Sequence, residues 1–187
     1  SSIAFSRTLE WALRLVFLIS IPASVYLAVL AKPLMIALFQ YGQFSPEDAE
    51  MAGRSLVAFA VGLLGFVLVK VLAPGFFARQ DTKTPVKAGV FAVFVNIVFC
   101  FVLYRPLGHV GLAAATSIAG FVNAGLLYWW LYAEKIYRPT HGWLLYFSRV
   151  VLSAACMGLV LWIGAGDSEK WLEVGILQRV GMLIQWS

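Results

Sequence analysis

Long stretches without charged residues alternate along the chain with short segments that carry the charges. A transmembrane helix needs about 20 consecutive, mostly apolar residues. Backbone groups in lipid must be hydrogen-bonded within the protein, which leaves helices and closed barrels as spanning structures. The continuous apolar runs lack the alternating pattern of barrel strands, which favours helices. The pattern therefore predicts membrane-spanning helices over residues 15–31, 55–69, 88–104, 110–133 and 150–166, with the start of a sixth near Val174.

The composition supports lipid as the main solvent of this chain. Hydrophobic residues make up 61% of the 187 residues, charged residues 12%, and the mean hydropathy is +0.86. Soluble domains are typically about 45–50% apolar and about 25% charged. We therefore expect an all-α, multi-pass transmembrane helix bundle with five full spans and a truncated sixth. Both ends of the sequence are expected to be cuts within a longer protein.

Short motifs set the expected helix boundaries. Residues 45–48 read Ser-Pro-Glu-Asp, which favours a serine N-cap, proline at the first helical position and acids in the first turn. Pro74-Gly75 is expected to end that helix, and Thr84-Pro85 to begin the next as N-cap and first position. Residues 105–109 are expected to form another loop. Such short connections predict that successive helices are antiparallel neighbours.

The distribution of lysine and arginine predicts the orientation. Cytoplasmic loops of membrane proteins are enriched in these residues. With a cytoplasmic N-terminus, the outer flanks hold five basic residues and the cytoplasmic flanks nine. The outer five are Lys32, Arg54, Arg105, Lys170 and Arg179, and the inner nine are Arg7, Arg14, Lys70, Arg79, Lys83, Lys87, Lys135, Arg138 and Arg149.

The charge distribution and the cysteine positions give no indication of a binding site for nucleic acid, a metal or a cofactor. The net charge is +5, but the basic residues are spread between apolar runs and form no basic patch of the kind that binds nucleic acid. Cys100 and Cys156 each lie inside an apolar run without a CxxC spacing, so small buried hydrophobes are the expected role for both.

The segment FFARQDTKTPVK, residues 76–87, concentrates charge between two predicted spans. One interpretation is a positive-inside anchor with a helix cap. The other is a cytoplasmic element that takes part in gating or meets an anionic headgroup through Arg79, Asp81 and Lys83, helped by the positive end of the following helix dipole. Arg79 and Asp81 are expected to pair with each other or with a neighbouring helix end.

Polar side chains also lie inside predicted spans, at Asn96, Thr116 and Asn123. Such groups commonly form hydrogen bonds between helices. The alternative is a cation or substrate site, but a cation site needs a nearby carboxylate, and Cys100 one turn from Asn96 is a poor sodium ligand. Small residues spaced by four, Gly111, Ala115 and Ala119 ahead of Asn123, predict close helix packing.

A resemblance to a known family is carried by two longer motifs. LFQYGQFSPEDA and VGLLGFVLVKVLAPGFFARQDTKTPVK resemble the second-half signature of the MurJ (MviN) family of lipid II flippases, and PLGHVGLAAATSIAGFVNAGLLYW fits the pattern downstream. Members of this family belong to the MOP exporter superfamily and have fourteen helices, in two six-helix lobes plus an extra pair.

The resemblance implies a part of the C-terminal lobe of such a transporter. Residues 1–133 would hold four spans of that lobe, and 134–187 the extra pair, the second one truncated. The implied activity is alternating-access flipping of lipid II, without a catalytic or cofactor site, in the bacterial cytoplasmic (inner) membrane. The implied partners are lipid II, membrane lipids and the missing N-terminal lobe. The family's best-known cavity residues lie mainly in that lobe, so none is carried over.

Three alternatives remain at this point. The first is a flippase or exporter for another polyprenyl-linked saccharide or a drug. The second is a membrane enzyme acting on polyprenyl phosphates, which would need a carboxylate or histidine cluster, whereas His109 and His141 are isolated. The third is a structural membrane subunit without transport activity.

Overall fold

The computed structural model describes residues 2–39, 45–137 and 142–165. Within these ranges the regular structure consists of helices: α1 (Ser2–Val29), α2 (Ala31–Phe39), α3 (Pro46–Phe77), α4 (Lys83–Leu107), α5 (His109–Ala133) and α6 (Trp143–Ala165). All but α2 are long and apolar enough to cross a membrane, which confirms the five expected full spans. The expected sixth span near Val174 lies outside the described residues.

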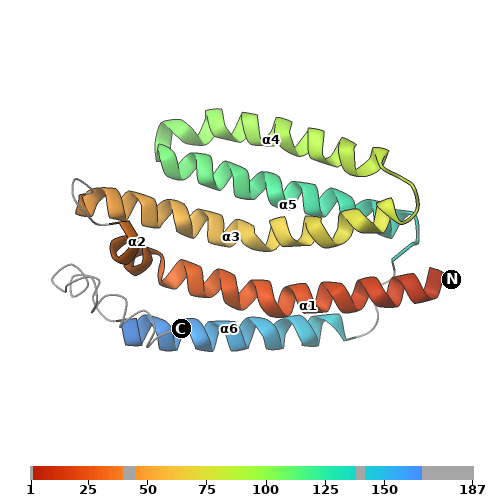
Figure 1. Cartoon of the computed structure of the whole chain (residues 1–187), viewed down its shortest axis with the longest axis horizontal. Helices are drawn as coiled ribbons and strands as arrows, with labels where there is room; N and C mark the ends of the chain where they lie inside the picture. The colour runs from red at the N-terminus through yellow and green to blue at the C-terminus, as the bar shows by residue number, and fades with distance from the viewer. Residues whose placement is uncertain (1, 40–44, 138–141, 166–187) are drawn as a thin grey trace.

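The five long helices form a row in the order α4, α5, α3, α1 and α6, with α2 packed on α3 (Figure 1). The start of α1, the α3–α4 connection, the end of α5 and the start of α6 lie at the same end of the long helix axes (Figure 1). We call this end the loop end. Arg79 and Lys83, two of the basic residues for which a cytoplasmic position is expected, lie at this end.

The spatial order differs from the expectation that successive helices are neighbours. Helices α3 and α4 are antiparallel, but α5 lies between them, so that α3 and α5 run parallel (Figure 1). A short connection fixes the direction of the next helix but not the helix that it packs on. The surface of α5, which packs on both α3 and α4, decides which helices are neighbours.

The start of α3 confirms the cap predicted at residues 45–48. The Ser45 hydroxyl accepts a hydrogen bond from the backbone nitrogen of Asp48 at 3.1 Å, and the backbone nitrogen of Ser45 donates to the Asp48 carboxylate at 3.0 Å. This reciprocal capping box satisfies two helix-end donors.

Three other expected boundaries are wrong. Helix α3 continues through Pro74-Gly75 to Phe77, α4 begins at Lys83 and not at Pro85, and α4 continues through Pro106 to Leu107. Proline near a helix end removes a single backbone hydrogen bond, which the surrounding packing tolerates. The connection between α4 and α5 shrinks to Gly108, whose φ of 55° suits glycine.

Helices α3 and α5 approach closely because glycines face each other. A Cβ atom added at Gly65 would lie 2.9 Å from the backbone carbon of Gly120, and one at Gly62 would collide with Ser117. The Ser117 hydroxyl donates to the Ala58 carbonyl of α3 at 2.6 Å. Small residues at the crossing therefore let the two backbones meet.

The small-residue stripe of α5 is a packing surface, as expected. Ala115 and Ala119 are buried, and a Cβ atom at Gly111 would collide with Leu103 of α4. At the loop end, α1, α3 and α5 share an apolar core with the residue Tyr137 that follows α5; its buried members include Leu13, Leu72, Phe76, Leu127 and Leu131.

The crossing predicts opposite effects for two glycine substitutions. Gly65→Ala should lower the thermal unfolding temperature of the full-length protein in detergent, because its methyl group meets backbone atoms of α5 that cannot move alone. Overpacking of this kind costs about 1–3 kcal/mol. Gly125→Ala is the matched control, because no atom lies within 4 Å of its added Cβ, and alanine favours the helix by up to about 1 kcal/mol. Equal shifts in the two variants would contradict the crossing.

Candidate functional site

The connection from α3 to α4 is a tight turn held by its own backbone. The Phe76 carbonyl accepts hydrogen bonds from the nitrogens of Arg79 at 2.9 Å and Asp81 at 3.1 Å, and Gln80 adopts a φ of 61°. These bonds satisfy the Phe76 carbonyl near the end of α3 and turn the chain back. The turn holds the charged residues of the predicted loop in fixed positions at the loop end.

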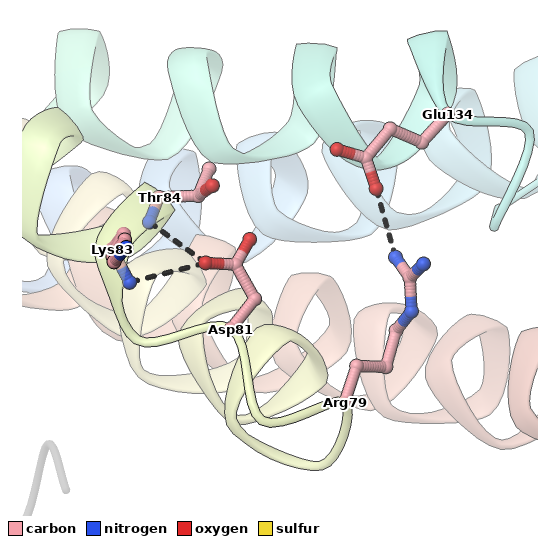
Figure 2. A network of polar contacts seen from close by, with 5 residues as sticks. All are labelled: Arg79, Asp81, Lys83, Thr84 and Glu134. Carbon is pink, nitrogen blue, oxygen red and sulfur yellow. Dashed lines mark hydrogen bonds and ion pairs between the residues drawn. The ribbon is translucent and has the colours of Figure 1, made fainter.

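Asp81 supplies the acceptor for the first turn of α4. Its Oδ1 accepts hydrogen bonds from the backbone nitrogens of Lys83 and Thr84, both at 3.1 Å (Figure 2). Hydrogen bonds from the side chain and backbone of Thr84 lower the pKa of this exposed carboxylate. The expected N-cap role of Thr84 is therefore wrong, because Asp81 lies within reach of the same helix-end donors.

Arg79 connects the loop to the end of α5. Its Nη1 donates to Oε2 of Glu134 at 2.8 Å, and Figure 2 shows the two side chains meeting across the space between the two elements. Of the two partners expected for Arg79, the neighbouring helix end is the one found. Glu134 was not singled out from the sequence, because the two residues lie 55 positions apart and neither spacing nor motif relates them.

Lys83 is the first residue of α4 and is exposed. A cation is unfavourable at the positive end of a helix dipole. The Asp81 carboxylate, bonded to the Lys83 backbone nitrogen, offsets part of that cost. In the part of the chain that the structure describes, the Lys83 ammonium forms no ion pair and is presented to the surroundings of the loop end.

A hydrogen-bonded chain connects α4 and α5 inside the spans. Asn96 Nδ2 donates to Thr116 Oγ1 at 3.2 Å, and that hydroxyl donates to the Leu112 carbonyl at 2.9 Å. Cys100 Sγ lies 3.6 Å from Asn96 Oδ1, a weak thiol hydrogen bond. These polar groups satisfy one another across the two helices, and no group of three or more His, Cys, Asp or Glu that could hold a metal ion occurs among the described residues.

Asn123 differs from this pair. Its Oδ1 is buried without a hydrogen-bond partner in the described part of the chain. Asn123, Asn96 and Thr116 line one groove of about 850 Å³ between α3, α4 and α5, together with Lys70 and apolar side chains. The structure thus brings the three predicted intramembrane residues to one groove but hydrogen-bonds only two of them to each other.

An aromatic cluster that was not expected from the sequence fastens α6 to α1. The Arg14 guanidinium pairs with the buried Glu10 at 2.7 Å and lies 5.7 Å from the ring centre of Trp143 and 5.5 Å from that of Tyr146. The Tyr146 hydroxyl donates to the Arg14 carbonyl at 2.7 Å. Tyr137 is buried beside this cluster, and burial raises the pKa of its phenol.

An apolar cleft of about 490 Å³ lies next to the aromatic cluster. Side chains of α1, α3 and α5 form its walls, and Tyr128, Tyr137 and Trp143 stand at its loop end. Aromatic side chains with a polar edge are typical of the membrane–water interface. The cleft is therefore suited to apolar material at that depth.

Comparisons with known proteins give a consistent picture. The family described as "Lipid II flippase MurJ" matches residues 2–180. The chain is 44% identical to a probable lipid II flippase MurJ of Vibrio cholerae over 94% of this chain and 33% of that protein. It is 39% identical to a probable lipid II flippase MurJ of Haemophilus influenzae, over 98% and 36%. A lipid II flippase MurJ of Burkholderia cenocepacia is 34% identical, over 96% and 35%.

A solved structure shows the same arrangement of helices. "Lipid II flippase MurJ, inward closed conformation" superposes with a TM-score of 0.77 and 25% sequence identity, over 97% of this chain and 38% of that one. The chain thus spans about a third of the length of the curated relatives that it matches, 33% to 36% for the three named above.

The Arg79–Glu134 contact predicts a small, salt-sensitive coupling energy. Both side chains are roughly half exposed, at 47% and 44%, and exposed ion pairs contribute about 0–1 kcal/mol. A double-mutant cycle with Arg79→Gln and Glu134→Gln, measured by thermal unfolding of the full-length protein, should give a coupling in that range that falls at about 1 M salt. The exposed pair Arg54–Glu50 is the matched control. A coupling above about 2 kcal/mol that salt leaves unchanged would contradict this description.

Proposed function

The chain belongs to the lipid II flippase MurJ family, and we propose that it forms the C-terminal part of a protein that flips lipid II across the bacterial cytoplasmic membrane. The observation that carries the proposal is the family match over residues 2–180. The chain also shares its fold with a solved member of that family. Five of the described helices are long and apolar enough to span a membrane, which agrees with an inner-membrane transporter. The flippase names of the relatives favour transport over the alternatives of a membrane enzyme and a structural subunit, and favour lipid II over other polyprenyl-linked saccharides and drugs.

In this proposal the chain supplies one wall of an alternating-access transporter. Residues 1–133 form the helices of the C-terminal lobe, and residues 134–187 contribute the extra pair, of which α6 is the described member. Helix α6 packs on α1 at the edge of the row, which suits an addition to a lobe (Figure 1). The N-terminal lobe, lipid II and membrane lipids are the partners.

A lipid II headgroup carries a pyrophosphate, which needs cationic or hydrogen-bonding groups along its path. Within the described spans, the groove between α3 and α4 offers a single cation, Lys70, and three amide or hydroxyl side chains. The charges that hold the headgroup at mid-membrane are therefore expected from the part of the full-length protein that this chain does not span.

The loop-end residues are proposed to act in transport rather than in insertion. Asp81 fixes the first turn of α4, and Arg79 ties that turn to the end of α5. Both orient Lys83, whose ammonium stands exposed at a helix N-terminus, a position that favours an anionic partner. A headgroup phosphate or a carboxylate of the other lobe would supply that partner.

The fragment and the full-length protein should differ in activity. In cells depleted of their own lipid II flippase, the full-length protein should restore growth, and residues 1–187 alone should not, because they form one side of a cavity. Membrane abundance of both proteins is measured by immunoblotting of the membrane fraction. Growth restored by the fragment would contradict the division of labour between lobes, and no growth with an abundant full-length protein would contradict the proposed function.

The loop-end proposal predicts that transport depends on the position of the Lys83 charge and not only on the number of positive charges in α4. Lys83→Ala in the full-length protein should keep normal membrane abundance and lose complementation. Lys87→Ala is the matched control, because it removes an exposed positive charge one turn further along the same helix. Arg79→Ala and Asp81→Ala should resemble Lys83→Ala more than Lys87→Ala. Equal activity of the Lys83 and Lys87 variants would leave the loop as a topological anchor.

A further inference from the structure

Helix α6 is attached to the other described helices mainly through α1, on which it packs in parallel at the edge of the row (Figure 1). The buried side chains of α6, Val150, Ala154 and Leu161, recur at the spacing of one helix face. Side chains on the remaining surface, such as Leu152 and Trp162, are 64% and 70% exposed. The position of α6 relative to the other helices therefore depends on its contacts with α1.

At the loop end, one residue of α1, Arg14, contacts α6 through both its side chain and its backbone. Its guanidinium lies 5.7 Å from the ring centre of Trp143 and 5.5 Å from that of Tyr146. The Tyr146 hydroxyl donates a hydrogen bond to the Arg14 carbonyl at 2.7 Å. Phe17, about one turn further along α1, meets Trp143 edge to face at a centroid distance of 5.8 Å. A shift of α6 along α1, or a rotation about its own axis, would break these contacts together.

Glu10, one turn earlier in α1, holds the arginine in place. The Glu10 carboxylate accepts a hydrogen bond from Arg14 Nη2 at 2.7 Å, and Glu10 is only 7% exposed. A buried carboxylate that loses its cation is strongly destabilising. Arg14 therefore keeps its place on α1, and the two rings of α6 pack against a cation in a fixed position.

A second contact fixes α6 toward the other end of α1. A Cβ atom built at Gly158 would lie 2.6 Å from Cγ1 of Val25 and 3.8 Å from Cγ2 of Val29, so the glycine lets the two helices approach closely. Val25 follows Arg14 by 11 residues, about 16 Å along the helix axis. Two contacts at this separation determine both the position and the tilt of α6 on α1.

We propose that Arg14 is a positioning residue that docks α6 on α1, and that α6 stays docked throughout the transport cycle, so that the two helices move as one body. Undocking would break the cation–ring contacts, the Tyr146 hydrogen bond and the Gly158 contact in one step, because α1 is the helix on which α6 mainly packs. The docking role of Arg14 rests on these contacts alone, and the statement about the transport cycle rests on the proposed function.

A disulfide between α1 and α6 tests whether the helices stay together during transport. The full-length protein carries Val25→Cys and Gly158→Cys, and its native cysteines, Cys100 and Cys156 included, are replaced by alanine. Disulfides need Cβ atoms about 3.5–4.5 Å apart. Cγ1 of Val25 is one bond of about 1.5 Å from its own Cβ, so the two Cβ atoms lie at most about 4.1 Å apart. In proteoliposomes that contain lipid II, the oxidised protein should flip lipid II as fast as the reduced protein.

The matched control for this disulfide pairs Val25→Cys with Leu159→Cys. Leu159 is the next residue on α6 and is 58% exposed, so this pair should not form a disulfide. Labelling of the denatured protein with a maleimide–polyethylene glycol measures the crosslinked fraction. Transport that is lost on oxidation and returns on reduction would overturn the proposal, as would equal crosslinking of the two pairs. If the unsubstituted protein flips no lipid II, the proposed function is wrong, and crosslinking still tests the docking.

The rate of disulfide formation in the protein with Val25→Cys and Gly158→Cys tests Arg14 without any transport. Arg14→Gln removes the cation from both rings and from Glu10, so α6 should lose its fixed position and the disulfide should form several-fold more slowly. Arg14→Lys keeps a cation near the same partners and should retain most of the rate. Tyr146→Phe removes only the hydrogen bond to the Arg14 carbonyl and should slow the disulfide less than Arg14→Gln.

Arg149→Gln is the matched control for the charge. It removes an exposed arginine of α6 that forms no ion pair among the described residues, so the disulfide should form at an unchanged rate. Equal rates in Arg14→Gln and Arg149→Gln would overturn the positioning role, as would an equal loss in Arg14→Lys and Arg14→Gln. Where Arg14→Gln does not accumulate in the membrane, an unchanged rate in Tyr146→Phe would overturn it.

Discussion

The close contact between α3 and α5 is the constraint on which the other packing in this chain depends. Lipid chains are as apolar as leucine, so helices in a membrane gain little from burying apolar surface against each other. Glycines at 62, 65 and 120 instead bring backbone atoms together, and the Ser117 hydroxyl adds a hydrogen bond to the Ala58 carbonyl. Helix α4 then packs on the far side of α5, and α1 on the far side of α3.

Polar groups hold the edges of the row by different means at different depths. Within the spans, Asn96 and Thr116 satisfy each other and join α4 to α5 without any charge. At the loop end, charges are usable because water is near. There, Arg79 joins the α3–α4 turn to Glu134, and Arg14, beside the rings of Trp143 and Tyr146, joins α1 to α6. The neutral hydrogen bond thus lies within the spans, and the charged contacts lie where water lowers the cost of a charge.

The sequence predicted the spans well because burial in lipid leaves a continuous local signal, as in residues 110–133 within α5. The insertion of α5 between α3 and α4 was beyond its reach, since that choice depends on surfaces far apart in the chain, such as Gly65 and Gly120. The expected helix end at Pro74-Gly75 and the expected loop at residues 105–109 are wrong because Pro74 and Pro106 lie in the last turns of α3 and α4, where a proline is tolerated. Asp81 was missed as a cap because Thr84-Pro85 offered a more familiar local motif. The Arg79–Glu134 and Arg14–Trp143 contacts join distant segments and have no local signature.

The uneven burial of the helices bears on how this chain would move in the proposed transporter. In the most apolar stretch of each helix, 44% of α5 is buried but only 11% of α4, so α5 is the central element and α4 the least supported one. Yet α4 is joined to α5 by the single-residue turn at Gly108, by the Asn96–Thr116 bond and by the contact of Gly111 with Leu103. Separating α4 from α5 would expose these polar groups to lipid at once. We therefore expect α4 and α5 to move as one body, with rearrangement confined to surfaces outside the row and to its loop-end connections.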